Sequence, residues 1–91
     1  MQMTICRRVH YWGKVQGVGF RYATARMARE HPVTGYVRNL LDGQVEIIVE
    51  GAPQHVDQFL AAVARQMTDF IRGTSVHEEM PQGFEGFTIR S

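Results

Sequence analysis

A single tight-turn signal near the middle of the chain most restricts what this sequence can form. Asp42-Gly43 separates two β-rich runs, residues 35–40 and 44–50. Leu41-Asp42-Gly43 joins the two runs, and an Asp-Gly pair between β-rich runs is a strong signal for a β-hairpin. Helix-forming segments flank the hairpin, over residues 20–31 and 53–67. The chain has 91 residues, so we expect residues 1–91 to form one domain with a single core.

Shorter β-rich runs at both ends complete the order of elements. Residues 4–12 alternate before the first helix, and residues 74–80 and 84–90 offer two further strands after the second helix. The order β-α-β-β-α-β-β, with short right-handed crossovers, predicts an α+β protein of the ferredoxin-like, or split βαβ, sandwich type. In that fold both helices cover one face of a mainly antiparallel sheet. We expect the last strand to be an addition at an edge.

Apolar side chains mark the surfaces that should be buried. In the second helix they recur as one stripe, at Val56, Phe59, Leu60, Val63 and Met67. In the third strand two sets alternate, Val45, Ile47 and Val49 with Glu46, Ile48 and Glu50. We expect the first set to face the core and the second set to face the wetter side of the sheet. Pro32 is expected to end the first helix at His31.

Composition excludes several classes of protein. Apolar residues make up 44% of the chain and the formal net charge is +1, so neither a disordered chain nor a polybasic nucleic-acid-binding arm is expected. Cys6 is the only cysteine, which excludes an internal disulfide and a cysteine-based zinc site. No apolar run approaches the ~20 residues of a membrane span, and no secretory signal is visible. We expect a soluble, cytoplasmic protein that binds neither nucleic acid nor a membrane.

The segment with the strongest chemical signal joins the first strand to the first helix. It reads Gly13-Lys14-Val15-Gln16-Gly17-Val18-Gly19-Phe20-Arg21. Its glycines let the backbone curl so that N–H groups point into one concavity, and the helix that follows adds the positive end of its dipole. A guanidinium at Arg21 could close on an anion held there. The plain alternative is a tight strand-to-helix turn with Arg21 in solvent. The run lacks the Gly-Lys-Ser/Thr ending of a P-loop and the third glycine of a dinucleotide fingerprint.

Asn39 is a second polar candidate, near the end of the second predicted strand. By itself it is typical of an amide that caps a turn. Sequence alone does not require it to lie near the glycine-rich run. Its neighbour Arg38 should point to the opposite face of the strand. The four histidines show no spacing of metal ligands, and we expect no metal site.

Taken together, the two segments resemble the two signatures of the acylphosphatase family. Residues 13–21 resemble the first signature, and residues 35–39, followed by Gly43-Gln44-Val45 and Gly51, resemble the second. The similarity of layout extends over nearly the whole chain, from Cys6 to Arg90. The resemblance implies the ferredoxin-like fold and the hydrolysis of acyl phosphates to a carboxylate and inorganic phosphate, without metal or cofactor.

The resemblance also implies roles for individual residues. The family's phosphate-binding arginine falls on Arg21, and its water-orienting asparagine falls on Asn39. Its phosphate cradle falls on the backbone of Val15, Gln16, Gly17, Val18, Gly19 and Phe20. The substrate is then a small-molecule acyl phosphate, and we expect the protein to be a monomer.

Two alternatives use the same fold. An RNA-binding module would need aromatic side chains on a central strand, and residues 45–49 contain none. A catalytically silent regulatory or interaction domain could keep the fold without the reaction. The presence of both Arg21 and Asn39 favours the enzyme over these alternatives.

Overall fold

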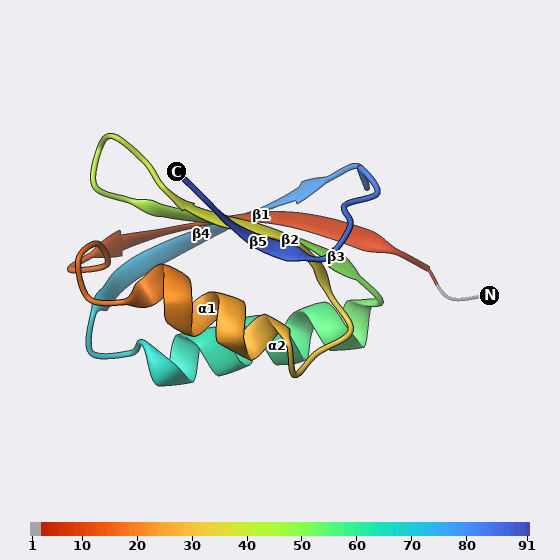
Figure 1. Ribbon diagram of the computed structural model, residues 1–91, viewed down its shortest axis with the longest axis horizontal. Coiled ribbons are helices and arrows are strands. Elements are labelled where there is room, and N and C mark those ends of the chain that lie inside the picture. The colour runs from red at the N-terminus through yellow and green to blue at the C-terminus, as the bar shows by residue number, and fades with distance from the viewer. Residues whose placement is uncertain (1–2) are drawn as a thin grey trace.

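The computed structural model describes residues 3–91 and shows two layers, a five-stranded sheet and a pair of helices (Figure 1). The strands are β1 (Ile5–Gly13), β2 (Thr34–Asn39), β3 (Val45–Gly51), β4 (Ile71–Glu79) and β5 (Phe87–Arg90). The helices are α1 (Phe20–Ala28) and α2 (Pro53–Gln66), and both lie on the same face of the sheet. Within the described residues no helix covers the other face, which we call the open face. The predicted ferredoxin-like α+β sandwich is confirmed.

The strands lie side by side in the order β4-β1-β3-β2-β5. Neighbouring strands are antiparallel except β2 and β5, which run parallel. β5 therefore adds at the edge next to β2, as the sequence predicts. In the central register His10 of β1 lies opposite Glu46 of β3, and Glu46 lies opposite Arg38 of β2. The next row of the sheet consists of Tyr11, Val45 and Asn39.

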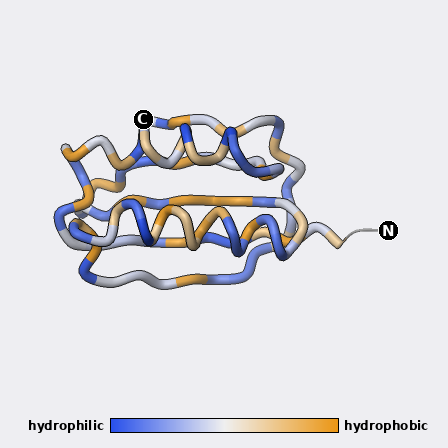
Figure 2. The backbone as a smooth tube through the Cα atoms, turned by 90° about the horizontal axis from the view of Figure 1, so that it is seen from below, coloured by the Kyte–Doolittle hydropathy of each residue, from blue (hydrophilic) through white to orange (hydrophobic). Residues whose placement is uncertain are grey.

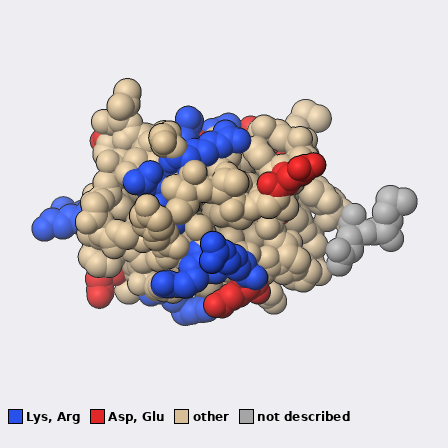
Figure 3. Space-filling view, in the orientation of Figure 1, with Lys and Arg blue, Asp and Glu red and all other residues tan. Residues whose placement is uncertain are grey.

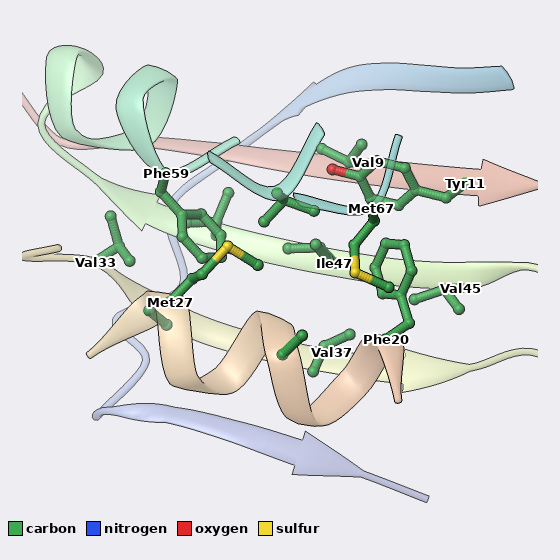
Figure 4. Close-up of a cluster of buried hydrophobic side chains, with 14 of the residues drawn as sticks. Val9, Tyr11, Phe20, Met27, Val33, Val37, Val45, Ile47, Phe59 and Met67 are labelled. Atoms are coloured by element: carbon green, nitrogen blue, oxygen red, sulfur yellow. The ribbon is translucent and has the colours of Figure 1, made fainter. Parts of the chain in front are cut away.

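The apolar core fills the space between the helices and the sheet. Each helix alternates hydrophobic and hydrophilic residues along its length, as expected for helices with one buried face (Figure 2). Val56, Phe59 and Val63 of α2 are fully buried and belong to the predicted stripe. Phe20 of α1 packs near Tyr11 of β1, with ring centroids 5.2 Å apart (Figure 4). Burial of Phe20 fixes the first turn of α1, and the loop before it, against the sheet.

Three element ends differ from the predictions by three residues, one of them in β5, which begins at Phe87 rather than at residue 84. α1 ends at Ala28 rather than at His31, because the N–H groups of residues 29–31 bond to carbonyls three residues earlier and continue as turns. Pro32 follows these turns, and a proline disfavours helical backbone in the residue before it. β4 begins at Ile71, earlier than predicted, because it pairs with β1 over almost the whole length of that strand.

The open-face side of β3 is buried, so the expectation that it is the wetter side was wrong. Glu46 and Glu50 are each 3% exposed, and Ile48 is 1% exposed. Tyr36 of β2 and Phe84, from the segment before β5, pack with Ile48 on this side, and their ring centroids lie 5.8 Å apart. The alternation along β3 is as predicted. Its polar members are buried because other strands supply the groups that cover and bind them.

Glu46 is the centre of a polar cluster on the open face, the Glu46 cluster, which also contains Arg8, His10, Tyr36 and Arg38. Arg8 Nη1 and Arg38 Nε each donate to the carboxylate at 2.8 Å, and the Tyr36 hydroxyl donates at 3.0 Å. The Nε2 atom of His10 lies 2.8 Å from the same carboxylate. Burial alone would raise the pKa of Glu46, but these four partners outweigh it and lower the pKa to about 2. The carboxylate therefore ties β1, β2 and β3 together.

The strand β1 ends in an arrangement that only glycine permits. The indole ring of Trp12 lies over Gly73 of β4, where an added Cβ would lie 2.4 Å from the ring. The register between β1 and β4 shifts directly after Trp12, at Gly13. The Lys14 N–H then donates to the Phe70 carbonyl at 2.9 Å. These contacts fix the place where the chain leaves the sheet and the glycine-rich loop begins.

Candidate functional site

The loop between β1 and α1, residues 14–19, is shaped by two glycines. Gly17 and Gly19 have φ angles of 77° and 80°, a left-handed conformation that glycine adopts without steric cost. Gly19 is the N-cap residue of α1 and offers no side chain to accept hydrogen bonds from the first turn. The first N–H groups of a helix need an acceptor from outside the helix, and the helix dipole adds a partial positive charge there. This backbone geometry favours an anion.

A hollow of about 140 Å³ opens between this loop, the first turn of α1 and the end of β2. It is lined by Val15, Gly17, Gly19, Phe20, Arg21, Tyr22 and Asn39. The structure thus brings Arg21 and Asn39 together with part of the glycine-rich loop. Gln16 and Val18, which belong to the same predicted backbone cradle, do not line the hollow.

Arg21 is the charged side chain of the hollow. Its Nη1 atom donates to the carbonyl oxygen of Arg90, at the end of β5, over 3.3 Å, which is long for such a bond. Among residues 3–91 no carboxylate forms an ion pair with it. A partly buried guanidinium with a weak neutral partner still has most of its donors for a bound anion, which it can grip at two points.

Asn39 reaches the hollow because of its place in the sheet. It is the last residue of β2 and shares the helix-covered face with the buried Val37. Arg38 points to the open face, where its Nε donates to Glu46, so the prediction that it faces away from Asn39 is confirmed. The pairing of Asn39 with Val45 fixes the backbone at this position.

Gln16 has a role that sequence reasoning missed. Its side-chain Nε2 donates to the carbonyl oxygens of Leu40 and Gln44, each at 2.8 Å. Leu40 directly follows Asn39, so one amide joins the glycine-rich loop to the hairpin that carries Asn39. Sequence reasoning assigned only the backbone of Gln16 to the site. One signal could have indicated this bridge. Gln16 carries a long amide side chain, and it lies in a loop that was expected to act through its backbone only.

Other reactive groups lie outside the hollow. Burial and the nearby Glu50 raise the pKa of the Cys6 thiol to about 11, so it stays protonated at neutral pH. Within residues 3–91 no group of three or more His, Cys, Asp or Glu side chains could hold a metal ion. Across the same residues, neither helix is long and apolar enough to cross a membrane. Basic and acidic side chains are both spread over the face in Figure 3, in keeping with a net charge of +1.

The fold and the hollow define a small two-layer α+β protein with a candidate anion site between its first helix and its central hairpin. Comparison with known proteins identifies the family. The sequence model of the acylphosphatase family matches residues 7–89. An acylphosphatase of Lactiplantibacillus plantarum is 47% identical over 79 residues, which cover 85% of this chain and 88% of that protein. An acylphosphatase of Thermococcus kodakarensis is 46% identical over 80 residues, covering 86% of this chain and 87% of that protein.

A solved structure agrees with these sequence matches. The crystal structure of acylphosphatase from Bacillus subtilis superposes with a TM-score of 0.86 at 33% identity and covers 98% of this chain and 100% of that chain. The chain therefore belongs to the acylphosphatase family, and it is a hydrolase of that class.

Proposed function

We propose that the hollow is the active site for hydrolysis of the carboxyl–phosphate bond of acyl phosphates to a carboxylate and inorganic phosphate. In this mechanism Arg21 and the N–H groups of the glycine-rich loop hold the phosphoryl oxygens, and Asn39 orients the attacking water. One observation carries the proposal: an arginine that pairs with no carboxylate among residues 3–91 and an asparagine amide line the same hollow beside a helix N-terminus.

Binding of the phosphoryl group uses charge and fixed dipoles. The Arg21 guanidinium forms two parallel hydrogen bonds to two phosphoryl oxygens, because its planar fork matches that geometry. Backbone N–H groups between Val15 and Phe20 bind the remaining oxygens at the positive end of α1. These donors are in place before the substrate arrives, so little reorganisation is needed when charge moves during the reaction.

The chemical step needs few side chains. Asn39 accepts a hydrogen bond from a water molecule at its amide oxygen and holds that water in line with the carboxyl leaving group. The leaving carboxylate is a weak base, because its conjugate acid has a low pKa, so it departs without being protonated and no general acid is required. The proton of the water passes to a phosphoryl oxygen of the substrate, since no histidine, carboxylate or lysine side chain of the described part of the chain lines the hollow.

The test is hydrolysis of benzoyl phosphate by the wild-type protein and two variants, with and without a chelator. Arg21→Ala removes the phosphate clamp, and we expect kcat/KM to fall by roughly 10³-fold with a raised KM. Asn39→Ala leaves the clamp in place, and we expect kcat to fall by about 10²-fold with little change in KM. We expect the chelator to change none of these values.

Arg26→Ala is the matched control, because Arg26 is an exposed arginine of the same helix that does not line the hollow. It should retain the wild-type rate. Equal activity of the wild-type, Arg21→Ala and Asn39→Ala proteins would contradict the assigned roles. A pH–rate profile that shows an enzyme group titrating near neutrality would contradict proton transfer to the substrate.

A further inference from the structure

Tyr22 is an aromatic side chain that the fold does not use. It lies in the first turn of α1 and is 70% exposed, whereas its neighbours Phe20 and Ala23 are buried in the core. Among residues 3–91 its ring stacks on no other aromatic ring and its hydroxyl takes part in no hydrogen bond. It nevertheless lines the hollow directly beside Arg21. An exposed ring at the rim of a polar hollow offers apolar surface to whatever extends out of it.

The in-line geometry of phosphoryl transfer indicates on which side of the hollow the acyl group of the substrate lies. The attacking and leaving oxygens lie on opposite sides of the phosphorus. With the water held at Asn39, the leaving carboxyl group and its acyl substituent must lie away from Asn39. Tyr22 lines the hollow from the first turn of α1, whereas Asn39 lines it from the end of β2, and Tyr22 does not line the second hollow described next.

A second hollow, of about 510 Å³, is the competing place for the acyl group. It is lined by Arg38, Asn39, Leu40, Leu41, Asp42 and Ser91. Asn39 lines both hollows, so the second one lies on the Asn39 side of the first. An acyl group there would be on the side from which the water attacks, and the displacement could not be in line.

We infer that the ring of Tyr22 forms the wall of an acyl subsite and contributes binding to a planar, apolar acyl group, such as an aroyl group, that a small aliphatic acyl group does not receive. This inference rests on the proposed function, because it uses the positions assigned to the phosphoryl group and the water. An aroyl group attached to the bound phosphoryl group is large enough to stack on the ring. An acetyl group offers only a methyl group to it.

The test is the ratio of kcat/KM for benzoyl phosphate to kcat/KM for acetyl phosphate. Loss of an aromatic contact costs about 0.5–1.5 kcal/mol, so Tyr22→Ala should lower this ratio by roughly 2- to 12-fold. Tyr22→Phe keeps the ring and should keep the wild-type ratio. Leu41→Ala removes an exposed apolar side chain of the second hollow and should also leave the ratio unchanged. Inhibition by inorganic phosphate should be similar in all four proteins, because the inference places Tyr22 against the acyl group only.

Three results would overturn the inference. The first is an unchanged ratio in Tyr22→Ala. The second is a fall of the ratio in Leu41→Ala, which would place the acyl group in the second hollow. The third is an equal fall in Tyr22→Phe and Tyr22→Ala, which would assign the effect to the hydroxyl group. Failure of the proposed function looks different, because the wild-type protein would then hydrolyse neither substrate.

Discussion

Arginines in two regions of this molecule have opposite surroundings. In the Glu46 cluster Arg8 and Arg38 each donate to one buried carboxylate at 2.8 Å. In the hollow, the contact recorded for the Arg21 side chain among residues 3–91 is a backbone carbonyl at 3.3 Å. The two regions are separated only by the sheet, because Arg38 and Asn39 are adjacent in β2 and their side chains point to opposite faces.

The comparison separates two uses of the same side chain. A guanidinium whose charge is met by a buried carboxylate joins strands and has little charge left to offer a ligand. A guanidinium that meets only a carbonyl keeps its charge and most of its donors. The Glu46 cluster therefore joins strands on the open face, and the hollow keeps an unmatched charge, as the proposed binding of an anionic substrate requires. The largest effect on activity is expected for the replacement of Arg21 described above, and the following changes test the Glu46 cluster and the link between the glycine-rich loop and the hairpin.

The largest effect on stability is expected for Glu46→Gln. The substitution leaves the positive charges of Arg8 and Arg38 facing a neutral amide, and breaking a buried pair in this way typically costs about 3–5 kcal/mol. Urea unfolding measures the loss. Glu78→Gln is the matched control, because Glu78 pairs with Arg7 at 3.0 Å but its side chain is 68% exposed. An exposed pair contributes at most about 1 kcal/mol. Equal losses of stability in the two variants would contradict a larger contribution of the buried carboxylate than of the exposed one.

Acid should weaken the protein through the same carboxylate. The pKa of Glu46 is about 2 in the folded protein, against an ordinary value of 4.5, so the unfolded chain binds a proton more readily. The stabilisation is complete above pH 4.5 and is lost as the pH falls toward 2, by about 3 kcal/mol in total. Unfolding free energies measured across this window should fall steeply in the wild-type protein and less steeply in Glu46→Gln. Parallel curves would assign the acid sensitivity to other groups.

A smaller effect is expected for Gln16→Ala, which tests the link between loop and hairpin. Loss of its two hydrogen bonds to backbone carbonyls should cost about 1–2 kcal/mol of stability. The loop and Asn39 would no longer be held at a fixed spacing, and we expect kcat to fall by about 10-fold while KM changes less. Gln58→Ala, at an exposed position of α2, is the control for both measurements. A stability loss with an unchanged kcat would show that the bridge serves the fold alone.

Much of the fold could be predicted because local signals and burial agree. The stripe in α2, Pro53 in its first turn and the turn at Asp42-Gly43 each indicate the structure that forms. The burial of Glu46 could not be predicted, because it depends on partners from β1 and β2 that only the register of the sheet brings together. A charged residue on an alternating strand indicates a solvated position unless those partners are known.

The same reason limits the prediction of the site. Each half of the hollow carries its own local signal, the glycine-rich run and Asn39. Their proximity depends on β3 lying between β1 and β2, which brings the end of β2 near the loop. From the sequence, that proximity came from family resemblance rather than from spacing. The bridge made by Gln16 and the exposure of Tyr22 are tertiary properties, and no periodicity encodes them.

The contact between Trp12 and Gly73 has a practical consequence. Trp12 is the only tryptophan in the sequence, and its ring packs on Gly73 near the end of β1, two residues before the glycine-rich loop. The molecule thus contains a natural fluorophore whose environment is set by the strand from which the loop departs. Its emission offers a label-free optical signal for the separation of β1 from β4 on unfolding, and a way to test the proposed binding of an anion in the loop.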